Sequence, residues 1–161
     1  MKITMFSSLL TILAVSSTTL AMPVASASPQ AAASQTISVS YDERYDKGAS
    51  SLTTVSCSDG TNGLITQGYS TFESLPNFPL IGGAPTVEAW NSPNCGKCYQ
   101  LHYQNGKVDK TINVLAVDSA VGAFNLGLQA MDQLTGGNAQ QLGRVDATYT
   151  EVEASQCGIT S

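Results

Sequence analysis

The stretch Asn91-Ser92-Pro93-Asn94-Cys95-Gly96-Lys97-Cys98 brings together two of the chain's four cysteines and leads directly into Tyr99-Gln100-Leu101-His102-Tyr103. In thioredoxin-like proteins a Cys-x-x-Cys pair follows a strand and opens a helix. Here the pair follows a loop rich in Asn and Pro and enters a segment that alternates like a strand, which disfavours redox catalysis. A zinc site is disfavoured as well, because Cys57 and Cys157 stand alone and no second close pair completes a ligand set. The sequence therefore predicts neither a metal nor another cofactor.

An even number of cysteines behind a secretion signal indicates disulfide bonds, and the first residues have the features of such a signal. Lys2 precedes an apolar run over 3–15, which is shorter than the roughly 20 residues of a transmembrane helix. We therefore expect a secreted, extracellular protein with two disulfides, whose pairing the residues alone leave open among three alternatives. The expected organisation is a signal peptide over 1–21 (cleaved at the latest after 27), a flexible leader over 22–35 and one folded domain over 36–161.

The composition excludes several classes of protein. Charged residues make up only 12% of the 161 residues, and 7 Lys and Arg face 12 Asp and Glu, which gives a formal charge of −5. An acidic chain without a basic cluster is a poor nucleic-acid binder, because neutralising phosphates supplies most of that affinity. With 42% hydrophobic residues, the chain is also too apolar for a disordered protein.

Alternation of apolar and polar residues, which is typical of half-buried strands, recurs along the chain. It predicts strands over 37–41, 99–103 and 145–152, and runs rich in β-forming or apolar residues predict further strands over 52–58, 64–69 and 111–117. The strand over 111–117 is expected to be buried on both faces, because its second half is apolar throughout. Asn105-Gly106 predicts a type I′ hairpin turn.

Helical signals are few and short. The apolar spacing of Leu126, Ala130 and Leu134 predicts a helix over 126–134 with Asn125 as its N-cap and Gly136-Gly137 at its end. A single helical turn is expected at 70–74, and the proline- and glycine-rich stretch 75–86 is expected to be loop. Many short strands with one or two short helices indicate a small β-barrel or sandwich.

Motifs along the whole mature chain resemble the cerato-platanin family of small secreted fungal proteins. The matching segments keep their order and cysteine spacing over about 120 residues. They are Val39-Ser40-Tyr41-Asp42, Cys57-Ser58-Asp59-Gly60, Pro76-x-Phe78-Pro79-x-Ile81-Gly82-Gly83, Trp90 to Cys98, Val117-Asp118-Ser119, Gly122-x-Phe124-Asn125, Gly143-Arg144-Val145-Asp146 and Cys157.

The resemblance implies a mainly β fold with short helices: a single six-stranded double-psi β-barrel, as in the first domain of expansins, closed by the bridges Cys57–Cys95 and Cys98–Cys157. It also implies a non-hydrolytic protein that binds chitin-type N-acetylglucosamine oligomers or other cell-wall polysaccharide. Wall remodelling of the expansin kind and the triggering of plant defence responses, through components of the plant surface, are the expected roles.

Asp118 is the strongest single candidate for a ligand-binding residue. It ends the most apolar strand and precedes a glycine-rich segment, and polar groups at such a position are well placed to face a ligand. The alternative is that Asp118 only accepts hydrogen bonds from the amides of the following turn. The carbohydrate site that we expect consists of Asp118, Ser119, Gly122, Phe124 and Asn125.

Other candidate side chains are given structural roles. Trp90 is expected to be buried beside the disulfides rather than to stack on a sugar. His102 is expected to be an ordinary strand residue, and the His-Phe-Asp motif of expansins has no counterpart here. Asp42 and Asp146 are candidate second carboxylates, but nothing in the sequence brings either near Asp118.

Two other functions compete with sugar binding. A polysaccharide-cleaving enzyme of hydrolase or transglycosylase type would use Asp118 together with a second carboxyl group about 5 to 10 Å away. A surface-active structural protein that assembles at interfaces would need large exposed apolar patches. Four cysteines rather than eight already distinguish the chain from hydrophobins.

Overall fold

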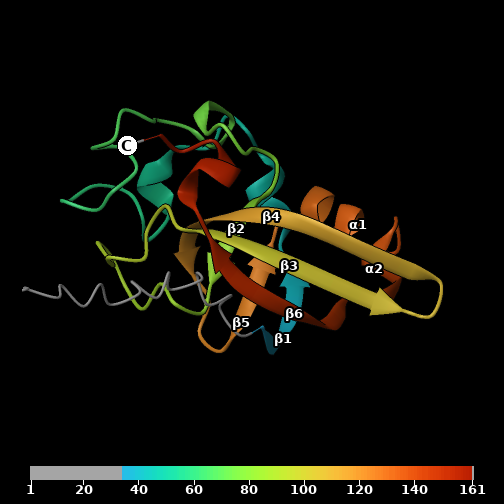
Figure 1. The fold of residues 1–161 in the computed structure, drawn as a ribbon. Helices are drawn as coiled ribbons and strands as arrows, with labels where there is room; N and C mark the ends of the chain where they lie inside the picture. Colours follow the sequence, from blue (N-terminus) through green and yellow to red (C-terminus); the bar gives the residue numbers. More distant parts are fainter. Residues whose placement is uncertain (1–33, 161) are drawn as a thin grey trace, which may run out of the picture. The chain divides into compact units, whose positions relative to one another are not determined.

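The computed structural model describes residues 34–160, which form one compact unit. Six strands and a few short helices make up this part of the chain, and they are labelled in Figure 1. The strands are β1 (Gln35–Tyr41), β2 (Ile81–Ala84), β3 (Cys98–Asn105), β4 (Val108–Ser119), β5 (Ala123–Leu126) and β6 (Arg144–Val152). The α-helices are α1 (Leu128–Thr135) and α2 (Ala139–Leu142), and the 3-10 turns are η1 (Glu43–Asp46), η2 (Leu52–Thr54), η3 (Phe72–Ser74) and η4 (Ala154–Cys157). The predicted signal peptide, and the predicted leader up to residue 33, lie outside the described residues.

The six strands close into a barrel in the order β1-β5-β2-β4-β3-β6. Two neighbouring pairs, β1 with β5 and β2 with β4, are parallel, and the remaining pairs are antiparallel. Closure leaves no free sheet edge in the barrel. The predicted six-stranded barrel with few short helices is therefore confirmed.

The hairpin of β3 and β4 is the longest antiparallel pairing, running from Cys98 opposite Leu115 to Asn105 opposite Val108. Its two loop residues are Gly106 and Lys107, of which only Gly106 has a positive φ. A type I′ turn needs positive φ at both loop residues. The hairpin was predicted in the right place, but the predicted turn type is wrong.

The barrel interior is packed with aromatic and aliphatic side chains. Tyr99, Phe124 and Tyr149 form an edge-to-face cluster with ring centroids 5.2 to 6.1 Å apart. In β4 the side chains of Val114 to Asp118 are all buried, as predicted for a strand covered on both faces.

Two predicted strands are wrong, and one strand was missed. Residues 52–58 and 64–69 form the 3-10 turn η2 and irregular turns, because their apolar side chains pack in the core from loops. The missed strand is β2, which lies in the stretch predicted to be loop. A Cβ at Gly82 would lie only 2.5 Å from the carbonyl oxygen of Asn125. Glycine there therefore permits a close strand contact instead of marking a turn.

Helix α1 begins two residues later than predicted, because Asn125 and Leu126 belong to β5. Its N-terminus is capped from a distant segment: the carboxylate of Asp46 in η1 accepts hydrogen bonds from Leu128 N at 2.6 Å and Gln129 N at 3.0 Å. The prediction that Asn125 caps the helix is therefore wrong. The predicted end is confirmed, since Gly136 closes α1 in the left-handed conformation at φ 66°.

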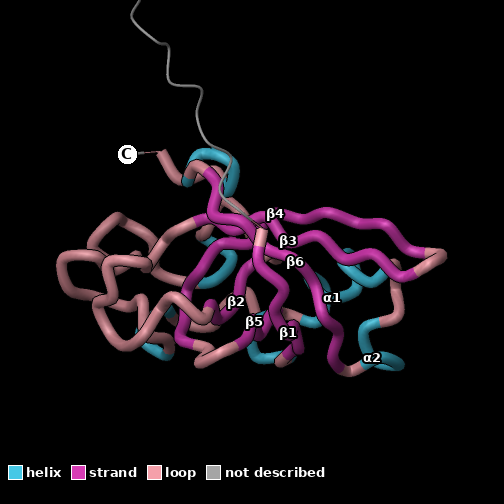
Figure 2. Tube along the Cα trace, turned by 60° about the horizontal axis from the view of Figure 1, so that its bottom comes forward, coloured by secondary structure: helices cyan, strands magenta, loops and turns pink. Residues whose placement is uncertain are grey.

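Both expected disulfides are present. Cys57 is bonded to Cys95 and Cys98 to Cys157, with Cα–Cα distances of 5.3 and 5.7 Å. The second bridge ties η4, which follows β6, to the start of β3. Long loops between β1 and β3 gather on one side of the barrel, away from the tip of the β3–β4 hairpin (Figure 2). Within the described residues no helix is both long and apolar enough to cross a membrane.

Candidate functional site

Asp118 lies at the end of β4 with only 6% of its surface exposed, and it is held by five donors. Its Oδ1 accepts from Ser56 N at 2.9 Å, Ser56 Oγ at 2.8 Å and Ser119 N at 2.8 Å. Its Oδ2 accepts from Arg44 Nη2 at 2.6 Å and from the Tyr45 hydroxyl at 3.0 Å. We call Asp118 and the four residues that donate to it the Asp118 cluster, which consists of Arg44, Tyr45, Ser56, Asp118 and Ser119.

The cluster connects three segments that are distant in the sequence: η1, the loop at Ser56, and the end of β4. Only the Ser119 amide belongs to the turn that follows Asp118, so the carboxylate does more than close a local turn. A buried carboxylate needs such compensation, because an unpaired buried charge is strongly destabilising. Asp118 is therefore a structural centre of this end of the barrel.

Arg44 is the most exposed side chain that contacts Asp118 through an ion pair, and its guanidinium is partly in contact with solvent. Its side chain is 48% exposed, whereas that of Asp118 is 9% exposed. The same guanidinium also contacts Asp42 through Nε at 3.4 Å. Asp42 and Asp118 are thus separated by one guanidinium group, a proximity that the sequence did not reveal. Burial raises the pKa of the Tyr45 hydroxyl, although the hydrogen bond from Arg44 opposes this shift.

Of the four other expected site residues, Ser119, Gly122 and Asn125 are exposed or half-buried, and Phe124 is buried. Gly83 of β2 pairs with Asp118 on one side and with Asn125 on the other, so the Cα atoms of Asp118 and Asn125 are about 9–10 Å apart, two strand spacings. Asn125 is half-buried, and its Oδ1 accepts from Ser40 Oγ at 3.1 Å. Ser119 is half-buried and Gly122 is exposed in the turn after β4. Phe124 has no exposed surface because it belongs to the aromatic core, so its inclusion in a ligand-contacting set is wrong.

Trp90, the chain's only tryptophan, is 60% exposed. The expectation that it is buried beside the disulfides is therefore wrong. Its indole nitrogen donates to Asp59 Oδ1 at 2.7 Å, which fixes the edge of the ring and leaves much of its surface open to solvent. This hydrogen bond lowers the pKa of Asp59.

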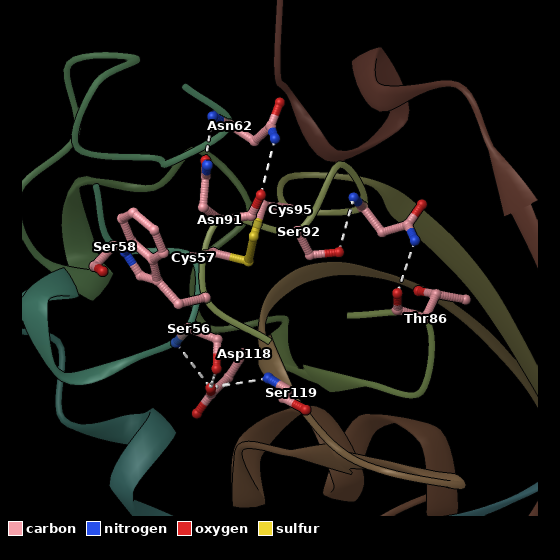
Figure 3. The surroundings of a disulfide bond; sticks show 12 residues. Ser56, Cys57, Ser58, Asn62, Thr86, Asn91, Ser92, Cys95, Asp118 and Ser119 are labelled. Atoms are coloured by element: carbon pink, nitrogen blue, oxygen red, sulfur yellow. Dashed lines mark hydrogen bonds between the residues drawn. A yellow bond between two sulfur atoms is a disulfide. The ribbon is translucent and has the colours of Figure 1, made fainter. Parts of the chain in front are cut away.

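The backbone beside Trp90 is fastened to the loop that carries Ser56. Asn91 N donates to the carbonyl oxygen of Ser56 at 3.2 Å, and Ser56 in turn contacts Asp118. Asn62 donates two hydrogen bonds to Asn91: from Asn62 N to Asn91 Oδ1 at 2.8 Å, and from Asn62 Nδ2 to Asn91 O at 2.9 Å (Figure 3). Asn91 has φ 58°, a conformation that Asn tolerates better than most residues. The exposed indole and the Asp118 cluster are therefore parts of one cross-linked surface.

The sequence did not point to Arg44, Tyr45 and Ser56 as partners of Asp118. Arg44 offers the one usable signal, since it is one of only two arginines in a chain with few charges and lies three residues after the end of a predicted strand. Ser56 and Tyr45 carry no local signal, because their role arises from contacts across more than 60 residues of sequence.

The remaining titratable candidates lie elsewhere. His102 is a half-exposed residue of β3, as predicted, and its Nε2 lies 2.8 Å from Asp109 Oδ1 on the neighbouring strand. Asp146 is exposed on β6, opposite Ser38 of β1. Over residues 34–160, no three His, Cys, Asp or Glu side chains are grouped so as to hold a metal ion.

Comparisons with known proteins give one family. The cerato-platanin family model matches residues 37–159. Allergen Asp f 15 of Aspergillus fumigatus is 56% identical over 121 residues, which are 75% of this chain and 76% of the relative. The crystal structure of cerato-platanin 2 from M. perniciosa is 41% identical, with a TM-score of 0.74 over 78% of this chain and all of the other.

The solution structure of a protein described as "the fungal elicitor Cerato-Platanin" is 38% identical, with a TM-score of 0.67 over 75% of this chain and 96% of the other. The sequence match, the barrel and the disulfide pairing agree along the whole described domain. The chain therefore belongs to the cerato-platanin family.

Proposed function

We propose that this protein is a secreted, non-hydrolytic carbohydrate-binding protein whose ligands are chitin-type N-acetylglucosamine oligomers. The observation that carries the proposal is the exposed indole of Trp90, which Asp59 and the Asn62–Asn91 pair hold in place beside the Asp118 cluster. An exposed tryptophan whose indole is hydrogen-bonded to Asp59, and whose neighbouring backbone is held by Asn62, is an unusual use of a large apolar side chain, and it suits a binding surface.

The chemistry of this surface fits a sugar. The apolar face of a pyranose ring packs against an aromatic ring, while its hydroxyl and acetamide groups need hydrogen-bond partners. Arg44 and Asn125 are polar and partly exposed near Asp118, and Asp59 borders the indole. A flat aromatic platform with few polar groups favours shallow binding of a chain rather than enclosure of a monomer.

Binding without cleavage is favoured by the state of Asp118. A glycosidase needs one carboxyl group that donates a proton and a second that acts as base or nucleophile. Both oxygens of Asp118 already accept hydrogen bonds, three at Oδ1 and two at Oδ2, so the carboxylate is occupied by contacts within the fold. The Arg44 guanidinium also stands between Asp118 and Asp42.

Cleavage remains the second candidate, because Asp42 lies only one guanidinium away from Asp118. In that case a ligand would have to displace Arg44 so that the two carboxyl groups face the glycosidic bond. The surface-active alternative has weaker support. The large hydrophobic side chains exposed over residues 34–160 are Trp90, Val121 and Leu142, isolated along the chain rather than a broad apolar face.

We further propose that the protein acts outside the fungal cell, in wall remodelling of the expansin kind and as an elicitor of plant defence. One structurally related protein is called a fungal elicitor, and one relative is named an allergen. Both names fit a protein that other organisms encounter at the fungal surface.

The proposal is tested by isothermal titration of the N-acetylglucosamine tetramer into wild-type protein, Trp90→Ala and the exposed control Leu142→Ala, which lies in α2 outside the expected site. We expect Trp90→Ala to weaken binding about tenfold and Leu142→Ala to leave it within twofold. A parallel assay for reducing ends should find none with wild type. Equal affinity in Trp90→Ala would contradict the proposed surface, and release of reducing ends would favour the enzyme instead.

A further inference from the structure

A groove of about 920 Å³ lies on a different part of the domain from the Asp118 cluster. Its walls come from the loop around Tyr69, the start of β3 at Gly96 and Lys97, the end of β6, and the last residues before the C-terminus. No residue of the Asp118 cluster lines it. The two regions are linked by the Cys57–Cys95 disulfide, because Cys95 lines the groove and Cys57 follows Ser56 in the chain.

Three charged side chains line this groove, and two of them neutralise each other. Lys97 Nζ lies 2.8 Å from Glu151 Oε1 and 3.1 Å from Oε2, so this pair contributes no net charge. The third is Glu153, an exposed residue between β6 and η4 that forms no ion pair with any other residue in the range 34–160. Among the described residues, the groove therefore carries one uncompensated negative charge, that of Glu153.

The other walls suit a ring with hydroxyl groups. Tyr69 contributes a half-buried aromatic ring, Val152 and Ile159 contribute apolar surface, and Gln67 contributes an amide. Gly96 has φ 75°, and a Cβ there would lie 3.8 Å from Gln67 Nε2. The positive φ is what favours glycine at this point, and the Gln67 amide lies within van der Waals distance of it at the wall of the groove.

We propose that this groove is a second carbohydrate site, selective for an amino sugar that carries a free, protonated amine. The ammonium group binds Glu153, the sugar ring lies against Tyr69, and a hydroxyl reaches Gln67. An N-acetylated sugar has no charge to offer Glu153, so the groove prefers deacetylated units, whereas the Trp90 surface takes acetylated ones. The chain's net charge of −5 adds long-range attraction for a polycationic glycan.

The charges predict opposite effects for two substitutions. Glu153→Gln removes the unpaired carboxylate and should weaken binding of a glucosamine tetramer about fivefold. Lys97→Gln frees Glu151 and should strengthen that binding two- to fivefold. The matched control is Asp146→Asn, which also removes one negative charge from an exposed side chain. Asp146 lies on β6 five residues before Glu151, which is roughly 17 Å along the strand.

The experiment is isothermal titration of glucosamine and N-acetylglucosamine tetramers into the oxidised full chain and these three variants, at two salt concentrations. We expect the glucosamine tetramer to bind more tightly than the acetylated one at this site, with an affinity that falls as salt rises. Trp90→Ala should leave glucosamine binding within twofold, which separates this site from the proposed function.

Three results would overturn the proposal. The first is that the glucosamine tetramer does not bind. The second is that wild type, Glu153→Gln and Lys97→Gln bind it with equal affinity. The third is that Asp146→Asn loses as much affinity for it as Glu153→Gln does. Loss of glucosamine binding in Trp90→Ala alone would assign the ligand to the Trp90 surface and also overturn the second site. Failure of acetylated sugars to bind anywhere would contradict the proposed function and leave this test intact.

Discussion

Replacing Asp118 by Asn should destabilise the domain markedly, although only one oxygen becomes an amide. The retained oxygen can still accept from Ser56 and Ser119. The new NH2 group, however, replaces the oxygen that accepts from Arg44 Nη2 at 2.6 Å and from the Tyr45 hydroxyl at 3.0 Å. A hydrogen bond to a charged group contributes about 1.5–3 kcal/mol.

Two further effects bound the magnitude of this loss. Breaking a fully buried ion pair costs about 3–5 kcal/mol, but Arg44 is 48% exposed, so solvent compensates much of its charge. The Tyr45 hydroxyl can rotate towards another acceptor. We therefore expect the free energy of unfolding to fall by about 2–3 kcal/mol, out of the roughly 5–15 kcal/mol typical of a domain.

Urea unfolding followed by far-UV circular dichroism, with both disulfides intact, measures this loss. Asp146→Asn is the matched control and should change the free energy of unfolding by less than about 0.5 kcal/mol. In the double variant Arg44→Gln/Asp118→Asn the two losses should be less than additive, because each single change breaks the same pair. A loss below about 0.5 kcal/mol in Asp118→Asn would refute the structural role of the cluster.

Three other contacts have measurable consequences. The hydrogen bond from Trp90 lowers the pKa of Asp59 in the folded protein below the ordinary aspartate value of about 3.9. The bond is therefore fully present above about pH 3.9, and it is lost as the pH falls through the lowered pKa of Asp59. Tryptophan fluorescence should therefore change in acid with a midpoint below about 3.9, and Asp59→Asn should abolish the transition; a midpoint at or above 3.9 would contradict the contact. Removing the 59-residue Cys98–Cys157 link with two alanines should cost several kcal/mol, since chain entropy alone gives roughly 4 kcal/mol, and an unchanged thermal midpoint would exclude this. Asp46→Ala should cost about 1 kcal/mol through the lost cap of α1, measured by thermal unfolding, and full stability would show that water replaces the cap.

The barrel strands with strict alternation were predictable because their periodicity and their burial have the same cause. Alternate side chains are buried in residues 99–103 and at Val145 and Ala147, whereas in 37–41 Val39 is buried and Ile37 and Tyr41 pack partly buried against the core. All three predicted strands are confirmed by β1, β3 and β6. The disulfide pairing came from family resemblance, because four cysteines alone allow three pairings.

The errors arose where long-range contacts override local signals. The two glycines of β2 are typical of a loop sequence. In the structure, the lack of a side chain at Gly82 allows β5 to lie close to β2. Asn is a residue type that often caps helices, but the backbone of Asn125 is paired within the sheet as part of β5. The helix is capped instead by Asp46, which is 82 residues away from Leu128 in the sequence. The exposure of Trp90 could not be predicted either, because it depends on Asp59 and Asn62 in another loop.

The central claim, that the Trp90 surface binds N-acetylglucosamine chains, is tested most directly by NMR. The tetramer is titrated into ¹⁵N-labelled protein while the amide signals and the single indole N–H signal are followed. We predict saturable shifts at the Trp90 indole and at the amides of Ser56, Asn91 and Ser119, with no change at the tip of the β3–β4 hairpin. Saturable shifts confined to other residues, or none at millimolar ligand, would contradict the account.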